Sequence, residues 1–474
     1  MADSYVSLKG ANGDSPSIPD DLLHFIQRET YSLLVKGFAG TGKTTLALTI
    51  LNVLGIRNNF FYISTRISPK QLFQYYPWLR DLIRQSKPRG ASLARDYDVM
   101  ASFEDARLDE PESLFERITN QLMDIKSPII IIDSWDAIAS FMDKEARLNN
   151  ERVLQTWRER AGAKLIFISE QPADTTLDFL VDGIVELKQI YYNNVKIRQM
   201  FLQKLRGTRI TRASYLYTLE NSIFHSFAPY QPIKFEPYRR SIADVPEFSK
   251  GDNIGSGFPT LDASLGTGFP RKGLVLLELD SHVSMTIAMI FLQRIVSNFV
   301  SGGNPVLLLP ANWMEPSSIL RFFETFPPDG KKSLFKILWT GKAYKISKNL
   351  ILPIKNETSD QLLAALVKMK QRYRDKFLLN IMCTEAVQSL YRARKMRDEM
   401  KNILSRIMAH ADLSIAVLTR SQEDILQFVS EVSNIHLRFM MINDTLFLQS
   451  LVPSSNLFSL IFDRQSQMSL KAVV

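Results

Sequence analysis

The sequence has very little cysteine and histidine. Cys383 is its single cysteine, and it has five histidines in 474 residues. One cysteine excludes an intrachain disulfide and fits a reducing cytoplasm, and so few thiols and imidazoles predict no zinc site. No run is long and apolar enough to predict a membrane span. The polar start, MADSYVSLKGANGDSPSIPD, lacks the apolar core of a signal peptide, so we expect a disordered segment over residues 1–17.

Length and charge set loose limits on the number of domains and on partners. The chain is 45% hydrophobic, which at this length is enough for two domains with separate cores. Its 58 Lys and Arg residues exceed its 49 Asp and Glu residues, giving a net charge of +9. Such an excess fits contact with DNA or another polyanion, but in a chain this long it is more typical of a solvated surface.

A glycine-rich motif near the start predicts a phosphate-binding loop. Residues 37–45 read GFAGTGKTT, with an apolar stretch before them at 31–36 and a helix-forming stretch after them at 45–51. Strand, glycine loop and helix in this order form the setting that a G-x-x-x-x-G-K-T motif requires. We therefore expect the following residues to line a nucleotide: Gly37, Phe38, Ala39, Gly40, Thr41, Gly42, Lys43, Thr44 and Thr45.

The residue types in this loop suit ATP and Mg²⁺. The glycines let the backbone bend and turn its N–H groups toward phosphate oxygens, and the positive end of the following helix adds to the attraction. We expect Lys43 to reach the β- and γ-phosphates as a catalytic cation, and the hydroxyl of Thr44 to bind Mg²⁺. A glycine turn without a ligand is the alternative, which the full match of the motif disfavours.

An apolar strand that ends in an acid should accompany such a loop. Residues 128–133 read PIIIID, and we expect Asp133 to hold the Mg²⁺ shell through water, as a metal-binding and catalytic residue. We expect Asp136 to cap a helix that begins at Ala137. Further strand patterns, separated by helical stretches, predict an α/β domain with a mostly parallel sheet flanked by helices; they lie at 59–64, 164–169 and 182–187.

The strand end IIIIDSWD resembles the RecA/KaiC branch of P-loop ATPases, in which Asp-Ser follows the apolar run. A second similarity is KLRGT at 204–208, because a K-x-R-G segment of KaiC-like ATPases reaches the ATP of the neighbouring subunit. The resemblance implies that Lys204 and Arg206 stabilise charge at a neighbour's γ-phosphate. It thereby implies a homo-oligomeric ring, with a hexamer as the expected size. A basic edge strand with solvated side chains is the alternative.

One departure from the KaiC pattern concerns hydrolysis. KaiC-like hydrolases carry glutamates just after the second strand, where this sequence reads STRISP at 64–69. Arg66 and Ile67 cannot accept a proton at neutral pH, so the general base is missing from that position. Glu170, just beyond the strand at 164–169, is a candidate catalytic substitute.

The stretch STRISP, the glycine loop and QYYPWL at 74–79 are together similar to the archaeal gas-vesicle regulatory protein D family, over residues 18–210. That family consists of KaiC/RecA-type P-loop proteins linked to the regulation of gene expression, so the resemblance implies a regulatory role. We expect the aromatic residues Tyr75, Tyr76 and Trp78 to pack in a core or a lid rather than to stack on bases.

The second half resembles a KaiC domain that has lost its nucleotide site. A segment at 226–253, rich in proline and charge, predicts a linker, and residues 254–273 resemble the opening of a KaiC domain. Aligning ELDSHVSMTIAMIFL with GFAGTGKTTLALTIL places Glu278 on Gly37 and Ser284 on Lys43, while Cys383 falls on Asp133. Glu278 and Asp280 would repel phosphate. We expect a tandem duplication whose second copy is degenerate.

These observations favour a cytoplasmic, ATP-binding regulatory protein made of tandem RecA/KaiC-like P-loop α/β domains. The ATP-binding domain is expected at 18–225 and the degenerate copy at 254–474, where it would serve assembly or bind a protein partner. Hydrolysis is expected to be slow or absent, which leaves open whether the chain is an ATPase. The alternative is an active RecA/KaiC-type ATPase that acts on DNA, which requires a carboxylate that the motifs do not locate.

Overall fold

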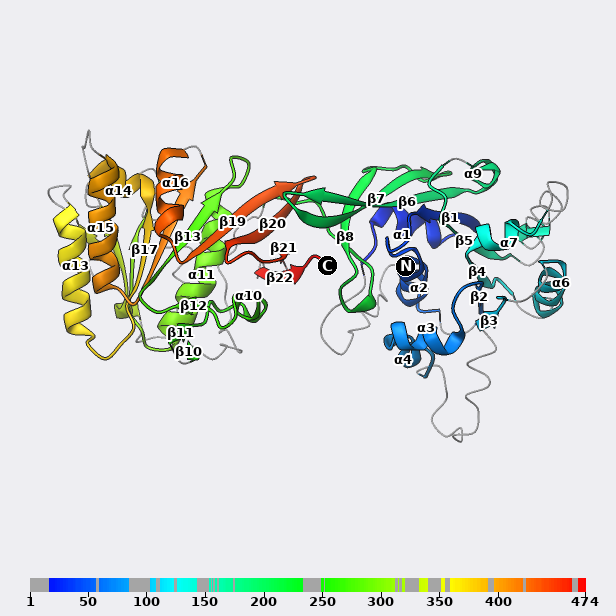
Figure 1. Cartoon of the computed structure of the whole chain (residues 1–474), viewed down its shortest axis with the longest axis horizontal. Helices are drawn as coiled ribbons and strands as arrows, with labels where there is room; N and C mark the ends of the chain where they lie inside the picture. The colour runs from blue at the N-terminus through cyan, green and yellow to red at the C-terminus, as the bar shows by residue number, and fades with distance from the viewer. Residues whose placement is uncertain are drawn as a thin grey trace. The chain divides into compact units, whose positions relative to one another are not determined.

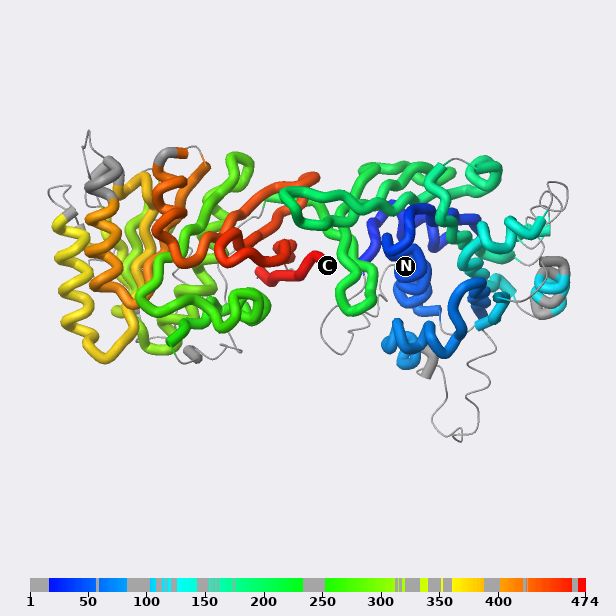
Figure 2. The backbone as a smooth tube through the Cα atoms, in the orientation of Figure 1, coloured from blue at the N-terminus to red at the C-terminus, as the bar shows by residue number. Residues whose placement is uncertain are grey.

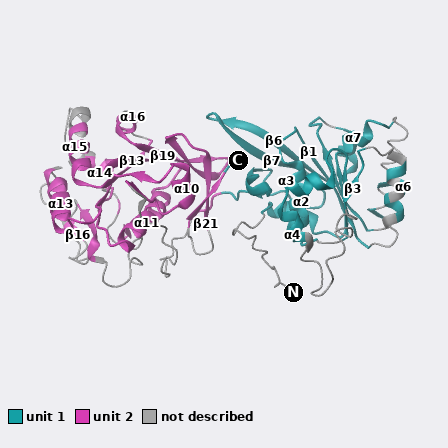
Figure 3. Cartoon of the chain, turned by 60° about the horizontal axis from the view of Figure 1, so that its bottom comes forward, with its two compact units in different colours: residues 1–229, 473–474 teal, residues 230–472 magenta. Residues whose placement is uncertain are grey.

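The structure is a computed structural model of a chain that divides into two compact units. The first unit contains residues 1–229 and 473–474, and the second contains residues 230–472 (Figure 3). The boundary falls inside the segment predicted as a linker. The described residues are 17–56, 59–84, 103–107, 111–122, 126–142, 153–154, 156, 158–159, 162–173, 175–232, 249–250, 252–311, 314, 318–319, 332–339, 351–353, 359–390, 396–420, 423–462 and 468–474. The predicted disordered start therefore lies, up to residue 16, outside the described residues.

Among the described residues of the first unit, a nine-stranded sheet has the order β3-β2-β4-β5-β1-β6-β7-β8-β9 (Figure 1). Strands β3 to β6 in this order pair in parallel, and β6 to β9 pair antiparallel. The strands are β1 (Tyr31–Gly37), β2 (Phe60–Ser64), β3 (Phe103–Asp105), β4 (Ile129–Asp133), β5 (Lys164–Ser169), β6 (Gly183–Tyr192), β7 (Val195–Leu205), β8 (Ser214–Thr218) and β9 (His225–Ser226).

Helices cover both faces of this sheet, because its parallel strands are apolar on both sides. On β1, Leu33 and Val35 belong to the core with α1 and α2, whereas Leu34 belongs to the core with α6, α7 and α9. The course of the chain around the sheet can be followed in Figure 2. The helices are α1 (Asp20–Ile26), α2 (Lys43–Val53), α3 (Pro69–Tyr75), α4 (Trp78–Arg84), α6 (Pro111–Leu122), α7 (Trp135–Ala139) and α9 (Thr176–Leu180).

The second unit has, within its described part, a ten-stranded sheet in the order β16-β15-β14-β17-β18-β13-β19-β20-β21-β22. The short strands β10 (Ser249–Lys250), β11 (Asn253–Ile254) and β12 (Phe269–Pro270) form a separate small sheet. The large sheet is made of β13 (Gly273–Leu279), β14 (Val306–Leu309), β15 (Phe335–Trp339), β16 (Ile351–Pro353), β17 (Leu379–Cys383), β18 (Leu413–Thr419), β19 (Ile435–Ile442), β20 (Thr445–Val452), β21 (Leu457–Phe462) and β22 (Met468–Ala472). The helices are α10 (Pro259–Ser264), α11 (Met285–Ser301), α13 (Ser359–Arg372), α14 (Thr384–Leu390), α15 (Met396–His410) and α16 (Glu423–Val432).

The two large sheets have the same connectivity. The run β3-β2-β4-β5-β1-β6-β7-β8 of the first unit corresponds strand by strand to β15-β14-β17-β18-β13-β19-β20-β21 of the second. Mostly parallel sheets of one topology, repeated in one chain, make these tandem RecA/KaiC-like α/β domains, as the sequence predicted.

Strand pairing corrects the predicted alignment of the two copies by one residue. The third residue of β1, Leu33, pairs with the first residue of β6, and the third residue of β13, Val275, pairs with the first of β19. Both strands span the same length, so Gly37 at the end of β1 corresponds to Leu279 at the end of β13, and not to Glu278. The apolar helices that follow align almost equally well in either register, whereas the hydrogen-bonded pairs allow only one.

The corrected register changes which residues replace the phosphate-binding ones. Helix α2 begins at Lys43 and α11 begins at Met285, each after a loop of the same length. Lys43 therefore corresponds to Met285, and not to Ser284, and Thr44 corresponds to Thr286. The predicted match of Asp133 with Cys383 is confirmed, since these are the last residues of β4 and β17.

Candidate nucleotide site

The glycine loop lies at the carboxyl end of β1, where ligands bind in open parallel sheets. Gly37 has φ +151°, and a Cβ there would lie 2.3 Å from the carbonyl oxygen of Leu187. Gly42 has φ +90°, and a Cβ there would lie 2.7 Å from the side chain of Leu219. Both positions exclude a side chain, which explains why the loop needs glycine at each end.

Side chains from neighbouring strands hold the backbone of the loop. The hydroxyl of Tyr217 on β8 donates a 2.5 Å hydrogen bond to the carbonyl oxygen of Thr41. The amide of Gln189 on β6 donates to the carbonyl oxygen of Gly40 at 2.7 Å. The tip of the loop is open to solvent, because Phe38 is 66% exposed. The loop therefore has fixed sides and an accessible tip.

Lys43 is at the start of α2 and turns back over the loop. Its Nζ donates to the carbonyl oxygens of Gly37 at 2.7 Å and Phe38 at 2.9 Å. Burial lowers the pKa of this ammonium, and the negative charges of Glu170 and Asp133 partly oppose the shift. The cation thus lies near two carboxylates, at the carboxyl ends of β4 and β5.

The carboxylate of Asp133 accepts hydrogen bonds from two hydroxyl groups. Thr44 Oγ1 donates to Asp133 Oδ2 at 2.6 Å, and Tyr62 on β2 donates to the same oxygen at 2.5 Å. Burial, followed by the charge of Asp133, raises the pKa of the Tyr62 phenol well above its usual range. The sequence predicted Thr44 and Asp133 together, but it gave no role to Tyr62. A hydroxyl in an apolar strand was the available signal, since a buried phenol needs a partner.

Asp136 does not cap a helix that begins at Ala137, and this prediction is wrong. Helix α7 begins at Trp135 after Ser134, so Asp136 is already inside its first turn. Its carboxylate accepts instead from the backbone N–H of Glu170 at 2.5 Å and from the hydroxyl of Ser169 at 3.0 Å. The side chain of Asp136 therefore fixes the backbone at the end of β5.

Glu170 faces Arg66 across the carboxyl end of β4. Arg66 Nη2 donates to Glu170 Oε2 at 2.7 Å, and Nη1 donates to Oε1, so both carboxylate oxygens are bound. The predicted substitute base and the arginine that replaces the expected glutamates are therefore partners of one another. The sequence predicted each of them as notable, but not their contact.

The aromatic residues of the stretch 75–78 pack beside the loop. Tyr76 OH lies 3.0 Å from Thr45 Oγ1, which brings this last residue of the motif into contact with the segment. Trp78 packs edge-on against Tyr76, and its indole donates to the carbonyl oxygen of Ser222 at 3.0 Å. Tyr75 is exposed. Packing contacts thus account for Tyr76 and Trp78, as expected.

Arg206 lies at the amino end of the parallel strands, and Lys204 lies level with Leu34 in the middle of β1. Lys204 pairs with Ile184 near the start of β6, whereas the loop follows the end of β1. Lys204 Nζ donates to the carbonyl oxygen of Asp178 at 3.0 Å, and Arg206 forms an ion pair with Asp182 at 3.2 Å. Asp182 is at the amino end as well, whereas Asp178 also pairs with Lys36 just before the glycine loop, and the trans role stays a prediction.

The second unit places different chemistry at the equivalent positions. Glu278 is fully buried in β13 and binds His436 Nε2 at 2.8 Å and Arg438 Nε at 2.8 Å. Asp280 pairs with Arg420 at 3.2 Å. The partners of Glu278 inside the sheet balance its negative charge, so the predicted repulsion of phosphate by this residue is weakened. Cys383 is buried, which raises the pKa of its thiol to about 12 and leaves it a neutral core residue.

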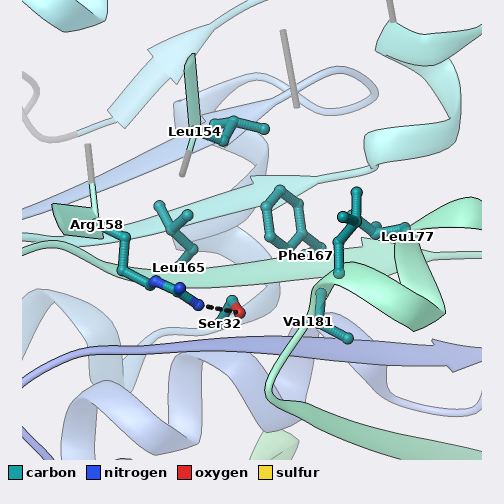
Figure 4. Close-up of a pocket in the computed structure, with 8 residues that line it drawn as sticks. Ser32, Leu154, Arg158, Leu165, Phe167, Leu177 and Val181 are labelled. Atoms are coloured by element: carbon teal, nitrogen blue, oxygen red, sulfur yellow. Dashed lines mark hydrogen bonds between the residues drawn. The ribbon is translucent and has the colours of Figure 1, made fainter. Parts of the chain in front are cut away.

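A small apolar hollow lies elsewhere in the first unit (Figure 4). Leu165, Phe167 and Val181 line it, and Arg158 reaches across it to Asp182 at 2.7 Å and to Ser32 at 3.4 Å. Ser32 is near the start of β1, so this hollow is distant along the strands from the glycine loop. Its polar groups already pair with one another.

Among the described residues, no group of three or more His, Cys, Asp and Glu side chains is arranged to hold a metal ion. No helix in the described part of the chain has the length and apolar character needed to cross a membrane.

Fold and loop together define the first unit as a P-loop domain of the RecA/KaiC class. Residues 23–204 match the family model described as "GvpD gas vesicle protein, P-loop domain". The chain is 25% identical to Protein GvpD2 of Halobacterium salinarum over 306 residues, covering 62% of this chain and 61% of that protein. It is 26% identical to Protein GvpD1 of the same organism over 307 residues, covering 62% and 56%.

KaiC gives a second set of similarities. The chain is 25% identical to the circadian clock oscillator protein KaiC of Thermostichus vulcanus over 312 residues, covering 60% of this chain and 53% of KaiC. The chain thus spans between half and two thirds of the length of these curated relatives. The resemblance to the gas-vesicle regulatory protein D family and to KaiC, predicted from the motifs, is confirmed.

Proposed function

We propose that this chain is an ATP-binding regulatory protein with one nucleotide site, in its first unit. The observation that carries the proposal is the convergence of Lys43, Thr44 and Asp133 at one edge of the first sheet. The equivalent edge of the second sheet has Met285 and Cys383 in place of the ammonium and the carboxylate. A tandem protein with one such set binds one nucleotide per chain.

The residues present fit ATP and Mg²⁺. The loop from Gly37 to Gly42 would hold the phosphates with its N–H groups, and Lys43 would neutralise their charge. Thr44 Oγ1 and Asp133 Oδ2 lie 2.6 Å apart, which offers a hard cation two neighbouring oxygens. Mg²⁺ bound there would screen the charge of the phosphates.

Slow hydrolysis is the second part of the proposal. The segment after β2 carries Arg66 where KaiC-like hydrolases are expected to carry glutamates. An arginine side chain cannot accept a proton at neutral pH, so this position supplies no general base for the attacking water. The bound nucleotide would then persist and act as a signal.

Assembly and regulation complete the proposal. Arg206 lies at the amino end of the strands, opposite to its own glycine loop, which supports a role of the segment with Lys204 and Arg206 at a neighbour's site in a homo-oligomer, with a hexamer as the expected ring. The similar proteins are titled as a gas vesicle protein and as a circadian clock oscillator protein. We therefore propose a regulatory process as the output, with the second unit as the part that contacts a protein partner.

Isothermal titration calorimetry with ATP and Mg²⁺ tests the site. We expect one equivalent of ATP per chain for the wild type and no binding for Lys43→Ala. The matched control is Met285→Ala, at the equivalent position of the second unit, which should bind like the wild type. Two equivalents per chain, or unchanged binding by Lys43→Ala, would contradict the proposal.

An active ATPase that acts on DNA is the second candidate. The observation that favours it is the position of Glu170, whose backbone Asp136 fixes at the end of β5, next to the glycine loop. Phosphate release measured with and without single-stranded and double-stranded DNA separates the two candidates. Slow release that DNA leaves unchanged supports the regulatory proposal, and fast DNA-stimulated release supports the second candidate.

A further inference from the structure

The ion pair between Arg66 and Glu170 lies inside the candidate nucleotide site and not at its edge. Arg66 follows β2, Glu170 follows β5, and β4 lies between these strands in the sheet. Neighbouring strands are about 4.8 Å apart, so the two side chains meet in front of the carboxyl end of β4. Asp133 is at that end, and the glycine loop follows β1 on the other side of β5.

The backbones that carry the pair are anchored independently of it. The backbone N–H of Thr65 donates to the carbonyl oxygen of Asp133 at 2.8 Å, which fixes the segment just before Arg66. The backbone N–H of Glu170 is fixed by Asp136 at 2.5 Å. Arg66 is therefore presented at a defined place, and a change of its partner requires rotation of the side chain alone.

The pair itself is exposed and easily exchanged. The side chain of Arg66 is 50% exposed and that of Glu170 is 31% exposed. Exposed ion pairs contribute little to stability, because water competes for both charges. The electrostatic influence of both charges extends to the ammonium of Lys43, the cation that would bind the phosphates.

We propose that Arg66 reads the γ-phosphate of bound ATP by exchanging Glu170 for it. The planar fork of a guanidinium matches phosphate as well as carboxylate, and a terminal phosphate carries the larger negative charge. With ADP bound, Arg66 stays with Glu170. With ATP bound, Arg66 turns to the γ-phosphate and leaves the carboxylate of Glu170 unpaired. This inference rests on the proposed ATP site.

The exchange would connect the nucleotide to a helix. Arg66 lies between β2 and α3, and Ser68 caps α3 in a reciprocal pair of hydrogen bonds with Gln71. The exchange therefore changes which charge is presented two residues before the N-cap of a regular element. The state of the γ-phosphate then becomes visible at the surface around α3.

The test compares affinities for ADP and for the non-hydrolysable ATP analogue AMP-PNP, both with Mg²⁺. In Arg66→Ala, the ratio of the affinity for AMP-PNP to the affinity for ADP should fall by about tenfold or more, because charged hydrogen bonds to the γ-phosphate are lost. The affinity for ADP should be unchanged. Arg66→Lys, which keeps the charge without the fork, should lose part of that preference. Glu170→Gln should increase the preference, because the competing carboxylate is removed.

Arg420→Ala is the matched control, since Arg420 is an exposed arginine paired with Asp280 at the equivalent edge of the second sheet. It should keep the wild-type preference. If Arg66→Ala keeps the wild-type preference while Lys43→Ala binds neither nucleotide, the inference fails and the proposed ATP site stands. If the wild type binds neither nucleotide, the ATP site fails, and the inference with it.

Discussion

Tyr62 donates a 2.5 Å hydrogen bond to Asp133 from the neighbouring strand, to the same oxygen that Thr44 contacts. The phenol therefore orients the carboxylate that is proposed to hold Mg²⁺. Removal of a hydrogen-bond partner of a metal ligand lowers the metal affinity by roughly 10- to 100-fold. Tyr62→Phe should reduce the increase in ATP affinity that Mg²⁺ provides by about tenfold. The affinity for ATP without Mg²⁺ should be unchanged, as measured by titration calorimetry.

Tyr31→Phe is the control for this change. Tyr31 is equally buried, and among the described residues its hydroxyl has no hydrogen-bond partner. Its removal should leave Mg²⁺ binding unaltered and should not lower the melting temperature, because an unsatisfied buried hydroxyl costs free energy. Equal effects of the two substitutions on Mg²⁺ binding would show that Tyr62 does not orient Asp133.

Gly37→Ala should be among the most damaging single-methyl additions in the first unit. The new Cβ would meet the carbonyl oxygen of Leu187 at 2.3 Å, at a φ of +151°. Strain and overpacking together should lower the free energy of unfolding by about 3 kcal/mol and abolish ATP binding. In Gly55→Ala, with φ +64° and no atom within 4 Å of the new Cβ, the loss should be about 1 kcal/mol, without an effect on ATP. Urea unfolding of both variants measures whether Gly37→Ala loses more free energy of unfolding than Gly55→Ala.

Glu278→Gln should reduce stability in a pH-dependent way. Burial opposes ionisation of Glu278, but the hydrogen bonds and charges of His436 and Arg438 prevail and hold its pKa below the ordinary value of 4.5. A lowered pKa stabilises the fold above that ordinary value, and this stabilisation is lost as the pH falls through the folded pKa. The substitution should cost about 3 kcal/mol at pH 7. The cost should shrink below pH 4.5. A cost that is independent of pH in urea unfolding would refute this account.

Lys36 and Asp178 form a buried ion pair in the first unit, at 2.6 Å. Burial raises the pKa of Asp178, but the hydrogen bonds from Lys36 and Thr175 outweigh burial and lower it overall, so the carboxylate stays charged. Lys36→Met should cost about 3–5 kcal/mol in urea unfolding, since it leaves that charge unpaired. The double variant Lys36→Met/Asp178→Asn should recover part of the loss. Additive losses would mean that the two side chains do not depend on one another.

The sequence predicted those parts of the site that depend on local backbone. Gly37 to Thr44 form one strand–loop–helix segment, and Asp133 ends an apolar strand, so spacing alone locates them. The contacts of Tyr62, Asp136 and Arg66 could not be predicted in this way. Each joins residues far apart in the sequence through the order of the strands, which motif spacing does not determine.

The alignment of the two copies shows the same limit. The fold class followed from composition and pattern, since apolar strands and helices recur in both halves. The register was off by one residue, because an apolar helix such as α11 matches α2 almost equally well when shifted. Only strand pairing identifies Glu278 as the counterpart of Lys36.

This reversal of charge discourages the two sheets from exchanging strands during folding. Lys36 lies opposite Glu186 on β6, and Glu278 lies opposite Arg438 on β19, at equivalent places in the two sheets. If β1 inserted beside β19, Lys36 would face Arg438, and β13 beside β6 would set Glu278 against Glu186. Either misassembly would bury two like charges side by side. This disfavours pairing of the central strand of one half with the sheet of the other.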